Sequence, residues 1–334
     1  MTDFTGGSGD DVFVGTESAD NARGGGGSDS LIGNGGNDIL AGDSGADYLE
    51  GGDGNDTLYS GDLSGQFSAP TVYGNPWTPP TLDTGNEVDT LIGGGGNDKL
   101  FAGYGDNVDG GTNDASGDAL YISFLGAPSG VTVDFRQSTL IVGGGTITGI
   151  EVIYWVEGSN FDDDISMQSS DEYTSSAPIF GLGGNDHLVA GYYTRTIWGG
   201  DGNDTIDGRG SQYLWSVDGG AGDDTLYTNT NTFASAYGGY GNDTIYADSL
   251  IDGGTGNDTI YIQAGYHPGQ VHGGSGDDTI FTALTQGHNA VFGDDGNDTL
   301  TGGQGNDTLD GGANDDIIDG GAGANALYGG IGND

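Results

Sequence analysis

A nine-residue unit recurs through the first part of the chain and constrains its fold more than any other feature. Six consecutive copies run from Gly6 to Tyr59, with the consensus G-G-x-G-x-D-x-U-x, in which U is apolar. Position 6 of these copies is Asp11, Asp20, Asp29, Asp38, Asp47 and Asp56, and position 8 is Phe13, Ala22, Leu31, Leu40, Leu49 and Leu58. A fixed period of this kind is typical of repeat architectures, in which each unit packs only on its neighbours. The repeat therefore predicts a solenoid rather than an ordinary globular domain.

The two halves of the unit predict different local structures. Glycine at positions 1, 2 and 4 permits backbone angles that other residues avoid, which favours a tight turn with inward-pointing carbonyl groups. The last three residues predict a short strand, whose alternation sends position 8 to one face and positions 7 and 9 to the other. Two units then complete a coil of about 18 residues, and successive coils form parallel strands about 4.8 Å apart. Turns on the same side are therefore expected two units apart, over a narrow core of stacked position-8 side chains.

The charge of the chain indicates which partners it can have. Asp and Glu total 51 against 5 Lys and Arg, which gives a formal net charge of -46, and only 33% of the residues are hydrophobic. This combination is typical of disordered chains, so we expect order only when cations neutralise the carboxylates. The same charge disfavours nucleic acid and anionic membrane surfaces, and no apolar run approaches the roughly 18 residues of a membrane span. Cysteine is absent, which excludes disulfides and thiolate metal sites.

The stacked turns predict a metal site made only of oxygen atoms. Between two turns the pattern places two aspartate carboxylates and several carbonyl groups. Cages of six or more oxygens suit calcium, whereas magnesium keeps its waters and transition metals prefer nitrogen or sulfur. A single Gly-Asn-Asp cluster would be an ordinary turn. Because the Asp here recurs in register, always two positions before an apolar residue, the repeat favours calcium.

With these nonapeptides, nearly the whole chain resembles the repeats-in-toxin (RTX) family. The resemblance implies an all-β fold, a right-handed parallel β-roll or β-solenoid with calcium bound in the glycine-rich turns. It implies that the position-6 carboxylates and the main-chain carbonyls of the turns are the ligands. It also implies export by type I machinery that reads an uncleaved C-terminal signal, and the N-terminal stretch "MTDFTGGSGDD" has no secretory signal pattern. The expected location is therefore extracellular, at the surface of a Gram-negative bacterium.

Interruptions of the repeat divide the chain into four expected segments. Residues 1–59 form a regular roll, and residues 60–92 hold an insertion whose proline density cannot continue a strand ladder. This insertion is either a tolerated surface loop or a loop that contacts a partner. Residues 93–180 begin with a clear copy that contains Asp98 and then fade, because Asn107 replaces the ligand aspartate in the next copy. We expect degenerate coils without metal from about residue 111 to 180, or alternatively a separate small β-domain.

The last segment, residues 181–334, has a different rhythm. Its clear repeats begin one coil apart, which predicts a single column of calcium sites along one edge. The position-6 residues of this column are Asp186, Asp204, Asp224, Asp243, Asp258, Asp278, Asp298, Asp316 and Asp334. The opposite edge has only two copies, one with Asp307 and one with Asn325 in place of the aspartate. Outward rows include the aromatic residues Tyr227, Tyr246, Tyr261 and Phe281, which either cover the sheet or offer a lateral contact surface.

The intact turns predict a large calcium load. On the order of 12 to 18 ions would fit if each ion is shared between stacked turns, and they would cancel about 24 to 36 of the negative charges. Extracellular calcium sites typically have dissociation constants of about 0.1 to 1 mM. The chain should therefore remain unfolded in calcium-poor cytosol and fold after export.

The sequence contains no catalytic constellation, so we expect a protein that is not an enzyme. Our first hypothesis is a secreted structural protein of an extracellular filament, surface layer or matrix. The alternatives are a secretion and folding module of a larger type I-secreted enzyme or toxin, and a soluble calcium-binding adhesin. The chain stops at position 6 with Asp334, whereas Asp3, Phe4 and Thr5 occupy positions 7 to 9 of the frame that starts at Gly6. These complementary pieces of one repeat predict head-to-tail self-association.

Overall fold

The computed structural model describes residues 2–61, 82–113, 117–167, 177–228, 233–263, 269–282 and 288–334. Within these ranges every regular element is a β-strand, as the repeat predicted. The described residues contain no helix that is long and apolar enough to cross a membrane. They form two compact units, the first ending at Ser159 and the second beginning at Asn160. Most of the expected insertion at 60–92 lies outside the described residues.

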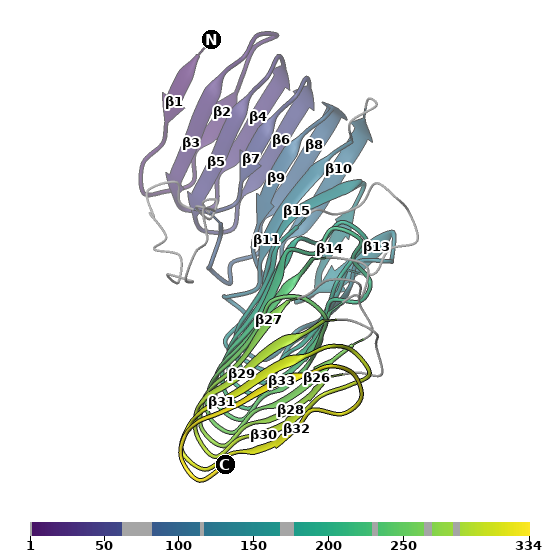
Figure 1. The fold of residues 1–334 in the computed structure, drawn as a ribbon. Helices are drawn as coiled ribbons and strands as arrows, with labels where there is room; N and C mark the ends of the chain where they lie inside the picture. Colours follow the sequence, from purple (N-terminus) through teal and green to yellow (C-terminus); the bar gives the residue numbers. More distant parts are fainter. Residues whose placement is uncertain are drawn as a thin grey trace. The chain divides into compact units, whose positions relative to one another are not determined.

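The first unit consists of two sheets whose strands come from alternate halves of each coil (Figure 1). One sheet contains, in spatial order, β1 (Asp3–Thr5), β3 (Asn21–Gly26), β5 (Ile39–Ser44), β7 (Thr57–Tyr59), β9 (Lys99–Ala102), β11 (Ala119–Ser123) and β15 (Val152–Glu157). The other contains β2 (Val12–Val14), β4 (Ser30–Gly35), β6 (Tyr48–Asp53), β8 (Thr90–Gly96), β10 (Asn107–Asn113), β14 (Gly145–Thr148) and β13 (Thr139–Val142). The pairs are parallel except for the hairpin of β13 and β14, which β12 (Thr132–Asp134) precedes in the chain.

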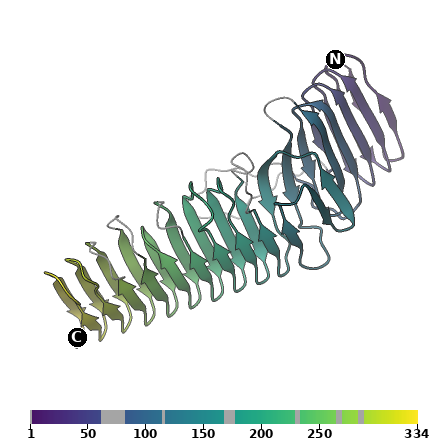
Figure 2. The ribbon, with the colours of Figure 1, turned by 90° about the vertical axis from the view of Figure 1, so that its right-hand side faces the viewer.

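The second unit repeats the same arrangement, and Figure 2 shows its coils stacked one behind another. One sheet contains β17 (Ile179–Gly183), β19 (Thr196–Asp201), β21 (Ser216–Ala221), β23 (Ser235–Tyr240), β25 (Ile251–Thr255), β27 (Gln270–Ser275), β29 (Ala290–Asp295), β31 (Thr308–Ala313) and β33 (Ala326–Ile331). The other contains β16 (Asp164–Ser166), β18 (His187–Val189), β20 (Thr205–Asp207), β22 (Thr225–Tyr227), β24 (Thr244–Ala247), β26 (Thr259–Ile262), β28 (Thr279–Thr282), β30 (Thr299–Thr301) and β32 (Ile317–Asp319). The fold is thus the predicted parallel β-solenoid.

Register between coils places identical repeat positions side by side. Leu31 pairs with Leu49, Leu49 pairs with Leu91, and all three side chains are fully buried. In the second unit, Ile206 pairs with Leu226, and both are also fully buried. A shift by one residue would turn these core side chains to the outside, so the apolar position 8 fixes the register.

Coil length varies without disturbing this register. The turns that contain Asp243 and Asp258 are only 15 residues apart, yet Thr244 still pairs with Thr259. The shortening falls on the side away from these aspartates, where three residues connect β24 to β25. Differences in length are therefore absorbed in the connections, while the glycine turns stay aligned.

Candidate metal centres in the glycine turns

Most glycine turns end in an aspartate that is hydrogen-bonded to the equivalent aspartate of a neighbouring coil. The backbone N–H of Asp204 donates to Oδ1 of Asp224 at 2.7 Å, and the N–H of Asp224 donates to Oδ1 of Asp243 at 2.8 Å. In the second unit this series runs through Asp163, Asp186, Asp204, Asp224, Asp243, Asp258, Asp278, Asp298, Asp316 and Asp334. These hydrogen bonds align the position-6 aspartates of the second unit in one column that begins at Asp163, and calcium binding along this column stays a prediction.

The first unit has two such columns, one at the start of each sheet's strands. One column lies just before the strands β2, β4, β6, β8 and β10. It consists of Asp11, Asp29, Asp47, Asp89 and Asp106. The column of the other sheet consists of Asp20, Asp38, Asp56, Asp98 and Asp118, and Glu151 closes it by accepting a hydrogen bond from the Asp118 N–H. Both columns cross the insertion without a break.

The second carboxylate oxygen of these aspartates is buried without a hydrogen-bond partner. This holds for Oδ2 of Asp29, Asp38, Asp47, Asp56, Asp89, Asp98, Asp118, Asp186, Asp204, Asp224, Asp243, Asp258, Asp278, Asp298 and Asp316. An unpaired buried charge is strongly destabilising, so native structures pair such groups or coordinate metals with them. A whole row of such oxygens at the same repeat position indicates that each of these turns is suited to hold a cation.

The glycine at position 1 leaves room for that cation. A Cβ atom at Gly33 would lie under 3.0 Å from both Asp38 Oδ2 and the carbonyl oxygen of Gly51 in the next coil. At Gly219 the corresponding oxygens belong to Asp224 and to the Gly238 carbonyl. Each space is thus bounded by a carboxylate oxygen and by a carbonyl oxygen, the kind of ligand that calcium prefers. The residues fit calcium, and glycine at position 1 leaves open the space that a side chain would fill.

Positions 2 and 4 need glycine for a different reason. Gly25 has φ 103° and Gly27 has φ 119°, which L side chains rarely adopt. Where another residue takes position 2, it is mostly Asn or Asp, as with Asn34 at φ 75° and Asp43 at φ 72°. The expectation that all three glycines serve backbone freedom is therefore corrected, because position 1 serves close approach.

Four predicted ligands differ from the rest, and they lie in the first or last coils. Asp11 Oδ2 accepts from the Gly7 N–H at 2.6 Å, and Asp307 Oδ2 accepts from the Gly303 N–H at 3.2 Å. Asp20 Oδ2 accepts from the N–H and the hydroxyl of Thr16, the residue that replaces glycine at position 2. Asp334 is exposed. At these turns a protein donor or solvent already satisfies the carboxylate.

The pKa values follow these environments. Burial, with like charges of neighbouring aspartates, raises the pKa of Asp224 and Asp278 to about 8 and that of Asp89 to about 9. At Asp20, burial acts in the same direction, but the hydrogen bonds from Thr16 and Thr2 outweigh it and lower the pKa to about 2. Without a cation the buried turns therefore favour protonated carboxyls, and a bound cation would reverse that preference.

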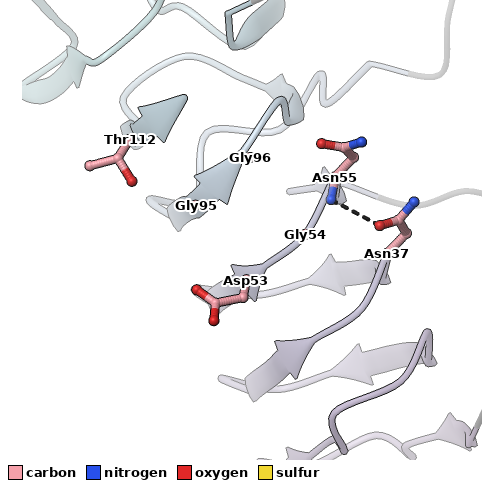
Figure 3. Close-up of a pocket in the computed structure, with 7 residues that line it drawn as sticks. All are labelled: Asn37, Asp53, Gly54, Asn55, Gly95, Gly96 and Thr112. Atoms are coloured by element: carbon pink, nitrogen blue, oxygen red, sulfur yellow. Dashed lines mark hydrogen bonds between the residues drawn. The ribbon is translucent and has the colours of Figure 1, made fainter. Parts of the chain in front are cut away.

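Position 5 carries a second ladder that the sequence analysis did not identify. The N–H of Asn55 donates to Oδ1 of Asn37 at 3.1 Å, beside a surface recess that is also lined by Asp53 and Thr112 (Figure 3). In the second unit the series runs through Asp162, Asn185, Asn203, Asp223, Asn242, Asn257, Asp277, Asn297, Asp315 and Asn333. Here each coil donates to the preceding one, opposite to the ladder at position 6. The recurrence of Asn and Asp at position 5 was the signal available in the sequence.

Two sites after the insertion were missed or misplaced. Asn107 does not replace a ligand, because it pairs with Thr90 at position 7 while Asp106 accepts the hydrogen bond from the Asp89 N–H. That prediction is wrong because this turn is one residue shorter than the repeat. Asp118 extends its column into a region where coils without metal were expected. It lies eight residues after Gly110 instead of five, so the repeat frame hides it.

Comparison with known proteins agrees with this geometry. The family model of the RTX calcium-binding nonapeptide repeat (4 copies) matches residues 5–40, 32–64, 83–108, 180–211, 216–230, 237–265, 270–283, 285–318 and 304–334. These matches cover more than half of the chain. No similar protein was found among curated sequences.

Proposed function

The chain belongs to the family of RTX calcium-binding nonapeptide-repeat proteins, and on this premise we propose that it is a secreted structural protein that folds on calcium. Folded copies associate with one another, head to tail or laterally, into an extracellular filament, surface layer or matrix of a Gram-negative bacterium. RTX repeats are typical of extracellular proteins exported by type I machinery, which supports this location.

The row of unpaired Oδ2 atoms carries the proposal. The chain has a net charge of -46, and most of the column aspartates are buried with an Oδ2 atom that accepts no hydrogen bond. Extracellular calcium modules bind at about 0.1 to 1 mM, far above the calcium level that fills cytosolic sensors at about 0.1 to 10 µM. The chain therefore stays unfolded before export, where calcium is scarce, and folds after export, where calcium is abundant.

Self-association is proposed from the edges of the sheet. Within the described residues, β33 pairs only with β31, and β1 pairs only with β3. Apolar side chains accompany the β33 edge, where Leu327, Tyr328 and Ile331 are 49%, 56% and 79% exposed. A strand edge with unpaired backbone groups and apolar side chains is a template for another chain. Pairing of β33 with β1 of a second copy would continue the ladder in an open stack.

We also propose that the protein has no catalytic activity of its own. Three of its four histidines lie in the described residues, and each contacts an acceptor in the adjacent coil. His187 pairs with Asp164 and His272 pairs with Asp294, while the acceptor of His288 is a backbone carbonyl. These contacts support a role in joining coils.

The first test is a calcium titration of the chelated chain, followed by far-UV circular dichroism with magnesium as the control. We expect a cooperative gain of β-structure near millimolar calcium at about pH 8, and a chain that is folded in excess chelator at this pH would contradict the proposal. A calcium-folded chain that stays monomeric would instead support the alternatives, namely a secretion module of a larger exported enzyme or toxin, or a soluble adhesin.

The second test addresses assembly by electron microscopy and analytical ultracentrifugation in calcium. Deletion of residues 329–334, or Leu327→Asp, should abolish assembly and leave calcium-induced folding largely intact. Tyr240→Asp is the matched control, because Tyr240 is 70% exposed on a strand that is paired on both sides. Assembly that persists in both edge variants would refute pairing through β33.

A further inference from the structure

Three buried aspartates meet where the chain returns from the insertion. Asp83 precedes the repeat, whereas Asp89 and Asp106 are the residues just before β8 and β10. Their exposed fractions are 7%, 0% and 2%, and one carboxylate oxygen of each lies within 4.8 Å of the other two. The ordinary turns of the column bring one carboxylate per coil, so Asp83 is an additional charge from outside the repeat pattern.

Hydrogen bonds hold these carboxylates in place but do not neutralise them. Asp83 Oδ1 accepts from the Gly85 N–H at 2.8 Å, and Ser60 Oγ lies 3.4 Å from Asp83 Oδ2. The two oxygens of Asp106 accept from the backbone N–H groups of Asp89 and Gly103. All of these donors are neutral groups. Three carboxyl groups are therefore gathered in the interior, and none of these hydrogen-bond partners is positively charged.

Asp89 adds to this cluster a buried oxygen that has no hydrogen-bond partner. Its Oδ1 accepts from the Asp47 N–H at 2.6 Å, but its Oδ2 is buried and has no hydrogen-bond partner. The charged groups that influence Asp83 and Asp89 are all carboxylates. The adjacent residues 62–81 contain no Lys, Arg or His. A fully buried carboxylate oxygen in such surroundings requires a bound cation or a proton.

We propose that Asp83, Asp89 and Asp106 form a three-carboxylate calcium site that binds more tightly than the repeat sites. All of the available ligand atoms are oxygens, which excludes a site of the zinc type. Ligands on opposite sides of a calcium ion are separated by about 4.6–5.2 Å, so the spacing of these oxygens suits this ion. The affinity of oxygen sites rises with the number of charged ligands. The site ties the return of the insertion, through Asp83, to two coils of the solenoid, and it does not depend on self-association.

The experiment counts calcium ions that the full chain retains. Calcium-saturated protein is dialysed against a weak chelator, and bound calcium is measured per chain by atomic emission. Wild type should retain one tightly bound ion that Asp83→Asn loses, with about a tenfold or greater loss of affinity at that site. Asp53→Asn is the control, because Asp53 is an exposed aspartate of the same unit. Equal retention by wild type and Asp83→Asn would overturn the proposal.

A second measurement needs no variant and covers the case in which Asp83→Asn fails to fold. Crystals of the calcium-loaded wild-type chain should show anomalous density between the three carboxylates. In a terbium soak, terbium should replace calcium at this site before it does so in the repeat turns. Density in the repeat turns with none at this cluster would overturn the proposal. That outcome would leave calcium-dependent folding and assembly untouched.

Discussion

Asp204 and Asp224 lie one coil apart, and the backbone N–H of Asp204 donates to Oδ1 of Asp224 at 2.7 Å. This bond orients the carboxylate so that Oδ2 borders the space at Gly219, which the Gly238 carbonyl closes. One side chain thus joins two coils through one oxygen and offers the other to a cation. Coil stacking and calcium binding therefore depend on the same residue, which explains why the repeat requires Asp at position 6.

Asp224→Asn separates these two roles. The amide oxygen would still accept the hydrogen bond from Asp204, but the buried ligand would lose its charge. We expect a higher calcium concentration at the folding midpoint and a loss of about 1–3 kcal/mol in the free energy of unfolding. Urea unfolding in the presence of calcium would measure the change in the free energy of unfolding.

The neighbouring variant Asp223→Asn is the matched control. Asp223 is exposed, and its Oδ1 accepts from the Asn242 N–H at 2.7 Å, a bond that an asparagine preserves. We expect a change within about 0.5 kcal/mol. Equal effects of the two substitutions would show that the carboxylate of Asp224 is not a ligand.

Two glycines of one turn can test whether calcium binds in the space beside position 1. A Cβ at Gly24 would enter the space between Asp29 Oδ2 and the Gly42 carbonyl, whereas a Cβ at Gly26 would meet only Ser8 Cα at 3.7 Å. Neither residue has the positive φ that favours glycine. Gly24→Ala should therefore displace calcium from that turn and lower stability by about 1–3 kcal/mol.

Isothermal titration calorimetry would count the ions bound by each variant. Gly26→Ala should bind as many as wild type. If Gly24→Ala also keeps the full number and affinity, the space beside Gly24 is not a calcium site.

The fold could be predicted from the sequence because its two determinants are local. The apolar residue at position 8 specifies the strand register, as Leu31, Leu49 and Leu91 illustrate, and the glycines specify the turns. The sites at Asp106 and Asp118 could not be placed, because their turns differ in length from the repeat. Their alignment depends on hydrogen bonds between coils, which no single nonapeptide encodes. Likewise, the carboxylate of Asp83 lies close to those of Asp89 and Asp106 only in the folded chain, so the sequence did not reveal this cluster.

The aromatic row of the second unit consists of rings that stack from one coil to the next. The centroid of the Tyr246 ring lies 4.9 Å from that of Tyr227 and 4.8 Å from that of Tyr261. These two residues belong to the coils on either side of Tyr246. Because stacked aromatic pairs contribute about 0.5–1.5 kcal/mol each, Tyr246→Ala should lower stability by about 1–3 kcal/mol. Tyr240→Ala, on a 70% exposed residue, should change little. Thermal unfolding at saturating calcium would compare them, and equal melting temperatures would show that the row does not stabilise the fold.

Protons should partly replace calcium in the chelated chain. The pKa of Asp224 and Asp278 rises in the metal-free fold from 3.8 to about 8, chiefly because of burial. The folded chain therefore binds more protons than the unfolded one, so these groups favour folding below about pH 4 and lose that contribution as pH rises through about 8. In excess chelator we expect β-structure to increase as the pH falls from 8 toward 4.5, as followed by circular dichroism with sedimentation to detect aggregates. In calcium the trend should reverse, because protons compete with the ion for the same oxygens. A chelated chain that is equally unfolded throughout this range would contradict the assignment of buried, unneutralised carboxyls.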